Sequence, residues 1–404
     1  MKIFWLTNGI LPIIAEKKKV EKDYGGGWWD LLSRKIVHLN EYNLIACYPS
    51  EKAENIKIDN IQVYSFSRTN EKNSIYFEKI LLEEKPDIIH IFGTEFPHTL
   101  AMVNAAEKCE MLNRVVINIQ GLVSIITKHY MADLPVKVQY AFTLRDLLKW
   151  DNLKQQQKKF KNRGVYEIKA LKKVTHVIGR TDWDKACTTQ INSKIQYHFC
   201  NEILRETFYK NEWSLEKCRK HSIFISQAHY PIKGFHKILE ALPIILKFFP
   251  DTVVYVAGED LRTKKNLKKI IKQSSYIKYI NKLIDKNGLE KQIKFLGSLN
   301  EQAMCQQFLK SHIFVSASSI ENSPNSVGEA MILGVPVVTS DVGGVKNLLT
   351  HGEEGFVYQA DAPYMLACYV CEIFGNDSLA LSFSKNAREH AVETHNRKEN
   401  LNKT

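Results

Sequence analysis

The chain has 404 residues, which is long for one hydrophobic core and sufficient for two domains of about 200 residues each. Its 44% hydrophobic and 25% charged residues are ordinary for a globular protein and exclude an intrinsically disordered chain. The formal net charge of +12 suits an anionic partner, which could be nucleic acid, a membrane surface or a phosphorylated ligand.

The cysteines and the apolar segments indicate a cytoplasmic protein. Eight cysteines are spread along the chain, without the dense framework of a small secreted module, so reduced thiols are expected. The apolar start suits a first strand over residues 2–7 better than a signal peptide, because Asn8 and Gly9 interrupt it. No apolar stretch reaches the roughly 18 residues that cross a bilayer.

A glycine-rich loop follows the first strand. Gly25, Gly26 and Gly27 precede a helix expected at about 29–39, and such glycines let the backbone approach a phosphate or a sugar closely. The GxGxxG pattern of dinucleotide-binding proteins is absent from this loop, which disfavours a dehydrogenase. A flexible hairpin remains the alternative interpretation.

Two further strands, within 85–95 and 115–121, end in small and polar residues. Parallel strands of a doubly wound sheet share their carboxyl edge, so both ends should open on one crevice. The segment 149–173 then carries nine Lys and Arg residues against two acidic ones. It is either a solvated helix face or a surface that docks on anionic lipid headgroups, where each basic residue contributes roughly 1 kcal/mol.

A linker is expected from 201 to about 219, and a second Rossmann-like half begins with a strand at 222–226. Lys233 and Gly234 follow this strand, and the next two strands, near 253–258 and 293–298, end at Gly258 and Gly297. Lys233 is either a surface lysine at a helix start or a ligand for a phosphate.

The most informative motif is Glu321 to Glu329, two glutamates separated by seven residues. A buried strand at 313–318 precedes it, a helix over 327–333 is expected to stop at Gly334, and 335–339 reads as the next strand. Asn325 or Ser326 is a good helix N-cap, so backbone N–H groups and the positive dipole end would point at a phosphorylated ligand. The alternative is that the two glutamates form only a cap and a solvated face.

With the G-V-P-V-V strand and the segment 341–345, this motif resembles retaining, nucleotide-sugar-dependent glycosyltransferases of the family 4 type, also called glycosyl transferases group 1. The resemblance extends to bacterial surface-polysaccharide enzymes. It implies an α/β GT-B fold, in which two Rossmann-like doubly wound domains face each other across a cleft. Residues 1–205 would form the acceptor-side domain, with a helix at 384–404 crossing back to it, and 206–383 the nucleotide-sugar-binding domain.

The resemblance also implies roles for individual residues. Glu329 would hold the ribose hydroxyls, and Glu321 and Lys233, the catalytic candidates, would lie near the donor sugar and its diphosphate. Donor contacts are expected from Gly25, Gly26, Gly27, Gly297, Ser298, Ser323, Pro324, Asn325, Ser326 and Glu329, and acceptor contacts from Glu95, His98 and Gln120.

Two positions depart from the family pattern. Gln120 stands where many relatives carry a histidine, which puts a proton-shuttle role there in doubt. Gln227 and Ala228 stand where relatives usually place an arginine before the lysine, and His229 or Arg180 could replace its charge.

The expected reaction moves a sugar from a UDP- or GDP-sugar to a glycan or lipid-linked acceptor, with retention at the anomeric carbon and with no metal or other cofactor. The expected setting is surface polysaccharide synthesis, with possible peripheral contact at the inner membrane face. Sugar-nucleotide epimerases and phosphorylases share this architecture, although the cofactor lysine site of a phosphorylase is not found. A basic nucleic-acid-binding protein is the non-enzymatic alternative, but no recognition-helix, zinc or aromatic RNA-binding motif supports it, so no nucleic-acid partner is expected.

Overall fold

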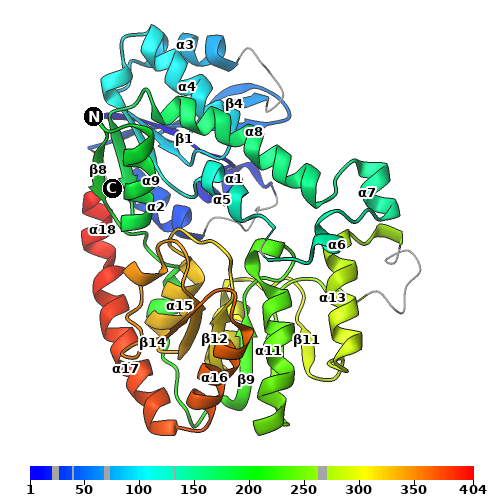
Figure 1. Ribbon diagram of the computed structural model, residues 1–404. Helices are drawn as coiled ribbons and strands as arrows, with labels where there is room; N and C mark the ends of the chain where they lie inside the picture. The colour runs from blue at the N-terminus through cyan, green and yellow to red at the C-terminus, as the bar shows by residue number, and fades with distance from the viewer. Residues whose placement is uncertain (21–26, 39–40, 68–72, 132, 263–270) are drawn as a thin grey trace. The chain divides into compact units, whose positions relative to one another are not determined.

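The computed structural model describes residues 1–20, 27–38, 41–67, 73–131, 133–262 and 271–404 (Figure 1). Contacts within the chain group the residues into two units. The N-terminal unit comprises Met1–Thr127, Phe160–Ile203 and Arg397–Thr404, and the C-terminal unit comprises Lys128–Lys159 and Leu204–Asn396. Residues 128–159 thus group with the second unit. The terminal helix expected at 384–404 is two helices, α17 (Asp377–Thr394) and α18 (Arg397–Lys403), and only α18 groups with the N-terminal unit.

Over the described residues, the N-terminal unit contains one eight-stranded sheet in the order β3-β4-β2-β1-β5-β6-β7-β8. The pairing is parallel except between β3 and β4, which are antiparallel. The strands are β1 (Lys2–Leu6), β2 (Asn43–Ser50), β3 (Glu54–Ile58), β4 (Ile61–Ser67), β5 (Ile88–Phe92), β6 (Val115–Asn118), β7 (His176–Gly179) and β8 (Gln196–Phe199). The strand order reverses between β1 and β5, which is where doubly wound sheets bind ligands.

The first strand shows why this sheet is buried on both faces. Phe4 and Leu6 belong to one hydrophobic cluster, whereas Ile3 and Trp5 belong to another. Successive side chains of a strand point to opposite faces, so an uninterrupted apolar run is what a covered parallel sheet requires. The helices of this unit are α1 (Pro12–Lys18), α2 (Gly27–His38), α3 (Asn73–Glu84), α4 (Pro97–Lys108), α9 (Asp182–Ile191), α18, and most of α5 (Val123–His129) and α8 (Leu153–Leu171).

The C-terminal unit contains, within its described part, a six-stranded parallel sheet in the order β11-β10-β9-β12-β13-β14. The strands are β9 (Arg219–Ile225), β10 (Val253–Val256), β11 (Ile293–Phe295), β12 (Ser311–Ser316), β13 (Val337–Ser340) and β14 (Gly355–Tyr358). This is the order of a dinucleotide-binding Rossmann sheet, and its reversal lies between β9 and β12.

The described helices of the C-terminal unit are α6 (Val136–Gln139), α7 (Leu144–Lys149), α10 (Glu206–Tyr209), α11 (Phe235–Phe248), α13 (Ser275–Lys286), α14 (Glu301–Leu309), α15 (Asn325–Leu333), α16 (Pro363–Phe374) and α17. Helix α11 packs against α16 and α13, and α15 packs against α17 (Figure 1). All residues of β12 are buried, as expected for a central strand.

The predicted α/β class with two doubly wound sheets is confirmed. Some element ends differ from the sequence-based expectation. The helix after Glu321 begins at Asn325 rather than Val327, and Pro324 occupies its N-cap position, so neither Asn325 nor Ser326 caps it. It stops at Gly334, with φ of 78°, as expected. Among the described helices, none is long and apolar enough to span a bilayer.

Candidate functional site

The carboxyl edge of the C-terminal sheet brings two predicted residues together at its reversal point. The loop after β9 carries Lys233, in a short 3-10 helix over Pro231–Lys233, and the loop after β12 carries Glu321. Lys233 Nζ lies 2.6 Å from Glu321 Oε1, and the Ser318 hydroxyl donates to the same oxygen at 2.7 Å. The two loops are also joined through the backbone, because Ser319 N donates to Ile232 O at 2.8 Å.

Two glycines explain why these loops approach so closely. Gly234 has φ of +68°, and a Cβ added there would lie 1.7 Å from the Ala317 carbonyl oxygen. Gly343 has φ of +54°, and its added Cβ would lie 1.7 Å from the Glu321 carbonyl oxygen. Only glycine tolerates both the positive φ and the contact with backbone. The lysine-glycine pair and the 341–345 segment therefore fix the backbone on either side of the Lys233–Glu321 ion pair.

Helix α15 begins directly after this loop. Ser323 is buried just before the helix, and the side chain of Pro324 provides no cap. A helix start carries a partial positive charge and N–H groups directed outward, so anions are favoured there. The predicted residues Ser323, Pro324, Asn325 and Ser326 thus surround a helix N-terminus that follows Glu321 in the chain.

Glu329 lies one turn into α15 and is paired with a residue that has no role in the sequence-based prediction. Arg205 Nε and Nη2 bind its two carboxylate oxygens at 2.6 and 2.7 Å, and the guanidinium also lies 4.5 Å from the centre of the Phe208 ring. Glu329 is only 6% exposed, and this burial raises the pKa of its carboxyl while Arg205 opposes the rise. Arg205 therefore holds the Glu329 carboxylate in one orientation.

The remaining residues expected at this edge lie at the tips of β10 and β11. Gly297 and Gly258 exchange backbone hydrogen bonds at 2.8 and 3.1 Å, and Ser298 is exposed beside them. His229 adjoins Gly258, where an added Cβ would lie 2.8 Å from its Nε2. Of the two proposed substitutes for the family arginine, His229 is thus at the sheet edge that carries Lys233.

Arg180, the other proposed substitute, is buried inside the N-terminal unit. Its Nη1 lies 2.8 Å from Glu202 Oε2, and its Nη2 donates to the carbonyl oxygens of Ile119 and Gln120. These contacts hold its guanidinium inside the N-terminal unit.

In the N-terminal unit, the predicted acceptor residues Glu95 and His98 lie at the reversal point between β1 and β5. Asn8 joins them, because its Nδ2 donates to Glu95 Oε2 at 3.2 Å and its Oδ1 is 2.8 Å from His98 Nε2. Gly93, at φ of +90°, leaves room for the Glu95 carboxyl, which a Cβ would approach to 2.1 Å. Burial, assisted by the Glu167 carboxyl, raises the pKa of Glu95 to about 7.

Glu167 on α8 is a second residue that the sequence-based prediction missed. Its fully buried carboxylate accepts hydrogen bonds from the Thr94 hydroxyl at 2.6 Å, from the Val123 and Ser124 N–H groups at 2.9 Å each, and from the Ser124 hydroxyl. It thereby joins the loop after β5 to the start of α5.

Gln120, the third predicted acceptor residue, follows β6 and donates from its Nε2 to Asn118 Oδ1 at 2.6 Å. Gly121 adjoins Glu95, since a Cβ there would lie 3.9 Å from Glu95 Oε1. Gly25 and Gly26 lie outside the described residues, and Gly27 is the first residue of α2. In the part of the chain that the structure describes, no three His, Cys, Asp or Glu side chains gather as a metal site would require.

Comparison with known proteins finds a family similarity over the part of the chain that contains the Lys233 and Glu321 loops. The family model described as Glycosyl transferases group 1 matches residues 206–390. The matched range contains Lys233, Glu321 and Glu329, and it starts directly after Arg205.

The curated relatives match only part of the chain. A putative glycosyltransferase, YtcC of Bacillus subtilis (strain 168), is 25% identical over 184 residues, which is 45% of this chain and 43% of the relative. Phosphatidyl-myo-inositol mannosyltransferase of Mycobacterium leprae (strain TN) is 26% identical over 162 residues, which is 39% of this chain and 38% of the relative. The chain thus spans less than half the length of these relatives.

Solved structures resemble the whole chain. Sucrose-phosphate synthase from Thermosynechococcus elongatus has a TM-score of 0.68 at 13% identity, covering 99% of this chain and 96% of that structure. Anabaena HepE in complex with UDP-glucose has a TM-score of 0.65 at 16% identity, covering both chains fully. These similarities confirm the predicted GT-B fold class.

Proposed function

We propose that the chain transfers a sugar from a nucleotide-diphosphate sugar to a hydroxyl group of an acceptor, with retention at the anomeric carbon. The observation that carries this proposal is the Lys233–Glu321 pair at the reversal point of the C-terminal sheet, inside the range that matches the glycosyltransferase family model. A cation and a helix N-terminus on one sheet edge suit the two phosphates of such a donor, because both favour negative charge.

The proposed chemistry requires the sugar's anomeric C–O bond to break, with its electron pair passing to the diphosphate oxygen. Lys233 stabilises the charge that develops on that oxygen, which lowers the barrier most when the cation is already in place. The Ser318 and Glu321 contacts hold the ammonium group in position before the donor arrives. The acceptor oxygen then bonds to the anomeric carbon on the same face, and its proton passes to the leaving phosphate.

Glu329 suits the hydroxyls of the donor's ribose. A carboxylate offers about four lone-pair positions, and Arg205 occupies one on each oxygen. The remaining positions can accept hydrogen bonds from two neighbouring hydroxyl groups. The role proposed for Glu329 therefore does not require the ion pair with Arg205 to break.

The acceptor proposal rests on the N-terminal unit, where Glu95, His98 and Gln120 would bind the hydroxyl groups of a glycan or a lipid-linked saccharide. Because the pKa of Glu95 is about 7, its ionised form can accept a hydrogen bond from such a hydroxyl near neutral pH, and its protonated form can donate one to it. We further propose UDP or GDP as the nucleotide, and a role in surface polysaccharide synthesis at the cytoplasmic membrane face. The UDP-glucose complex of HepE supports UDP as the nucleotide, and the phosphatidyl-myo-inositol mannosyltransferase relative supports a lipid-linked acceptor.

Product analysis tests the proposal. Purified protein is incubated with UDP-, GDP- or ADP-sugars and a panel of saccharide acceptors, and the anomeric protons of the products are followed by NMR. A product with the donor's anomeric configuration is expected from the wild type and from Lys385→Met, a control at an exposed lysine on α17, and not from Lys233→Met. Inversion would contradict retention, and donor interconversion without any acceptor would instead identify an epimerase.

A further inference from the structure

Helix α7 in the C-terminal unit has its apolar side outward and its polar side inward. Leu144, Leu147 and Leu148 are exposed, with Leu148 at 78%, whereas Asp146 in the same helix is completely buried. Trp150, directly after the helix, is 70% exposed. A surface helix normally turns its apolar stripe toward the core, so this arrangement needs an explanation.

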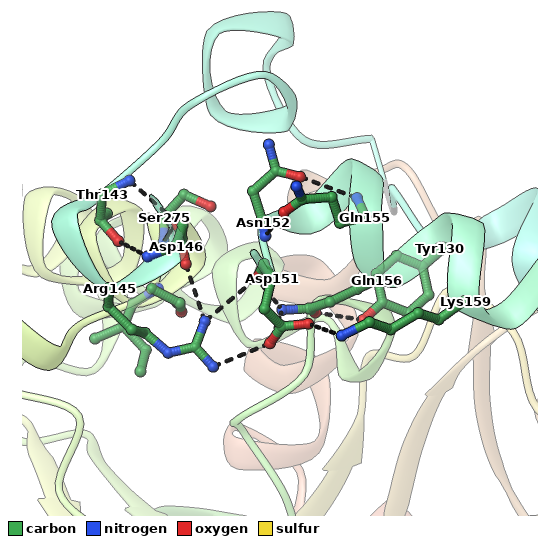
Figure 2. A network of polar contacts seen from close by, with 12 residues as sticks. Tyr130, Thr143, Arg145, Asp146, Asp151, Asn152, Gln155, Gln156, Lys159 and Ser275 are labelled. Atoms are coloured by element: carbon green, nitrogen blue, oxygen red, sulfur yellow. Dashed lines mark hydrogen bonds and ion pairs between the residues drawn. The ribbon is translucent and has the colours of Figure 1, made fainter. Parts of the chain in front are cut away.

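A polar network holds α7 in this inverted orientation (Figure 2). Thr143 and Asp146 form a reciprocal capping box, and Asp146 Oδ2 accepts a hydrogen bond at 3.1 Å from the N–H of Ser275, the first residue of α13. Figure 2 also shows Arg145 reaching both Asp146 and Asp151, at 2.9 and 3.1 Å. The leucines of α7 are thus left facing outward, because Asp146 in the same helix is buried and bound to α13.

Network contacts continue from α7 into α8. Asp151 binds Lys159 Nζ at 2.7 Å and accepts from Gln156 Nε2, whose own side-chain oxygen accepts from the Tyr130 hydroxyl at 2.6 Å. The turn containing Trp150 is thus held by polar contacts on both sides.

The exposed apolar residues form a continuous part of the chain, which we call the apolar tip. It consists of Val136, Tyr140, Phe142, Leu144, Leu147, Leu148 and Trp150. Single exposed apolar side chains occur on any protein. Seven of them between residues 136 and 150 indicate an interaction surface instead. Leucines together with Trp, Tyr and Phe are the composition of segments that lie at the membrane interface.

Basic residues accompany the apolar tip. Residues 128–159 contain seven Lys and Arg against three Asp, and each of these aspartates is paired with a Lys or Arg. Lys137 and Lys149 are exposed within the tip segment itself. Lys154 Nζ lies 4.7 Å from the centre of the Tyr140 ring. The charge that this surface presents outward is therefore positive.

A cavity of about 920 Å³ adjoins the tip between α6 and α13. Lys137 lines it from α6, and a row of lysines at helical spacing, Lys278, Lys282 and Lys286, lines it from α13. Asp285 also lines the cavity, so its lining carries four lysines against one carboxylate, and this excess of positive charge suits an anionic lipid headgroup.

We propose that the apolar tip docks the C-terminal unit onto an anionic lipid bilayer, with its leucines and aromatic rings in the interface and the surrounding lysines on the headgroups. A second copy of the chain fits this surface less well, because it would bring two positively charged rims together. The inference does not depend on the proposed transferase activity.

Vesicle flotation tests this docking surface. Full-length protein is mixed at low salt with vesicles of phosphatidylglycerol and phosphatidylcholine, or of phosphatidylcholine alone. The wild type is expected to float with the anionic vesicles only. The double variant Leu148→Glu/Trp150→Glu is expected to lose at least about tenfold in lipid partitioning, because both apolar contacts are removed and negative charge is added. Leu82→Glu, at a comparably exposed leucine on α3, is the matched control and should float like the wild type.

Quenching of tryptophan fluorescence by lipids with brominated acyl chains provides a second measurement. It does not require a substitution that could destabilise the fold. Trp150→Phe should lose the quenched part of the tryptophan emission while still floating. Flotation of Leu148→Glu/Trp150→Glu equal to that of the wild type would overturn the proposal, as would failure of folded wild type to float. A lipid-free dimer that this variant abolishes would show that the tip binds a second copy instead.

Discussion

Replacing Arg205 by alanine should destabilise the C-terminal unit strongly. The change leaves the Glu329 carboxylate, 6% exposed, without the two hydrogen bonds of 2.6 and 2.7 Å that now satisfy it. Removing one partner of a buried ion pair costs about 3–5 kcal/mol, because the other charge stays buried. Arg205 is itself 20% exposed in its side chain, so water can partly replace it, and we expect about 3 kcal/mol.

The assay is thermal and urea unfolding of wild type, Arg205→Ala, Glu329→Gln and the double variant. For a unit of this size, a loss of about 3 kcal/mol corresponds to roughly 6–12 °C in Tm. The double variant should lose less than the sum of the two single variants, since neither charge is left buried alone. Additive effects, or an Arg205→Ala variant as stable as the wild type, would refute the reasoning that this pair orients Glu329.

Three further predictions concern backbone contacts and buried carboxyls. Gly234→Ala should destabilise the C-terminal unit more than Gly288→Ala in the same urea assay. Both glycines have positive φ, but only Gly234 faces the Ala317 carbonyl oxygen. Equal losses of stability would show that this close approach does not matter. Glu95→Gln should flatten the pH dependence of the free energy of unfolding between about pH 4.5 and 7. The raised pKa of Glu95 means that the folded state keeps its proton while the unfolded state loses it, so the wild type loses stability as the pH rises from 4.5 to about 7. A wild type that gains stability over that range relative to the variant would contradict the sign. Glu167→Ala should cost about 3 kcal/mol in thermal unfolding by leaving several buried donors unsatisfied, and a loss below 1 kcal/mol would show that water replaces the carboxylate.

The elements around the Glu321 to Glu329 motif could be predicted because their signals are local. An apolar strand, a glycine stop and a second apolar strand follow one another within about thirty residues, and each follows from rules of local backbone conformation. Helix α15 begins two residues before the predicted start. Asn325 and Ser326 are good caps by residue type and Pro324 is not, yet proline's fixed φ permits the N-cap position.

The missed residues depend on pairs that are distant in sequence. Arg205 meets Glu329 across 124 positions, and Thr94 meets Glu167 across 73, so no local pattern connects them. From the sequence, a basic residue beside a linker is expected to be a solvated surface charge. Only the fold shows that Arg205 faces the buried carboxylate of Glu329. The inverted polarity of α7 was missed for the same reason, since the identity of its inward face is decided by Ser275 on another helix.

Saturation-transfer NMR with UDP-, GDP- and ADP-sugars tests the central claim that Lys233 and Glu321 form the donor site. Wild type, Lys233→Met and the exposed-lysine control Lys385→Met are compared at equal concentration, after circular dichroism has shown that all three are folded. The account predicts that one donor binds to the wild type and to the control, with its signal lost in Lys233→Met. Equal donor signals in Lys233→Met and the wild type, or no donor bound to the folded wild type, would contradict it.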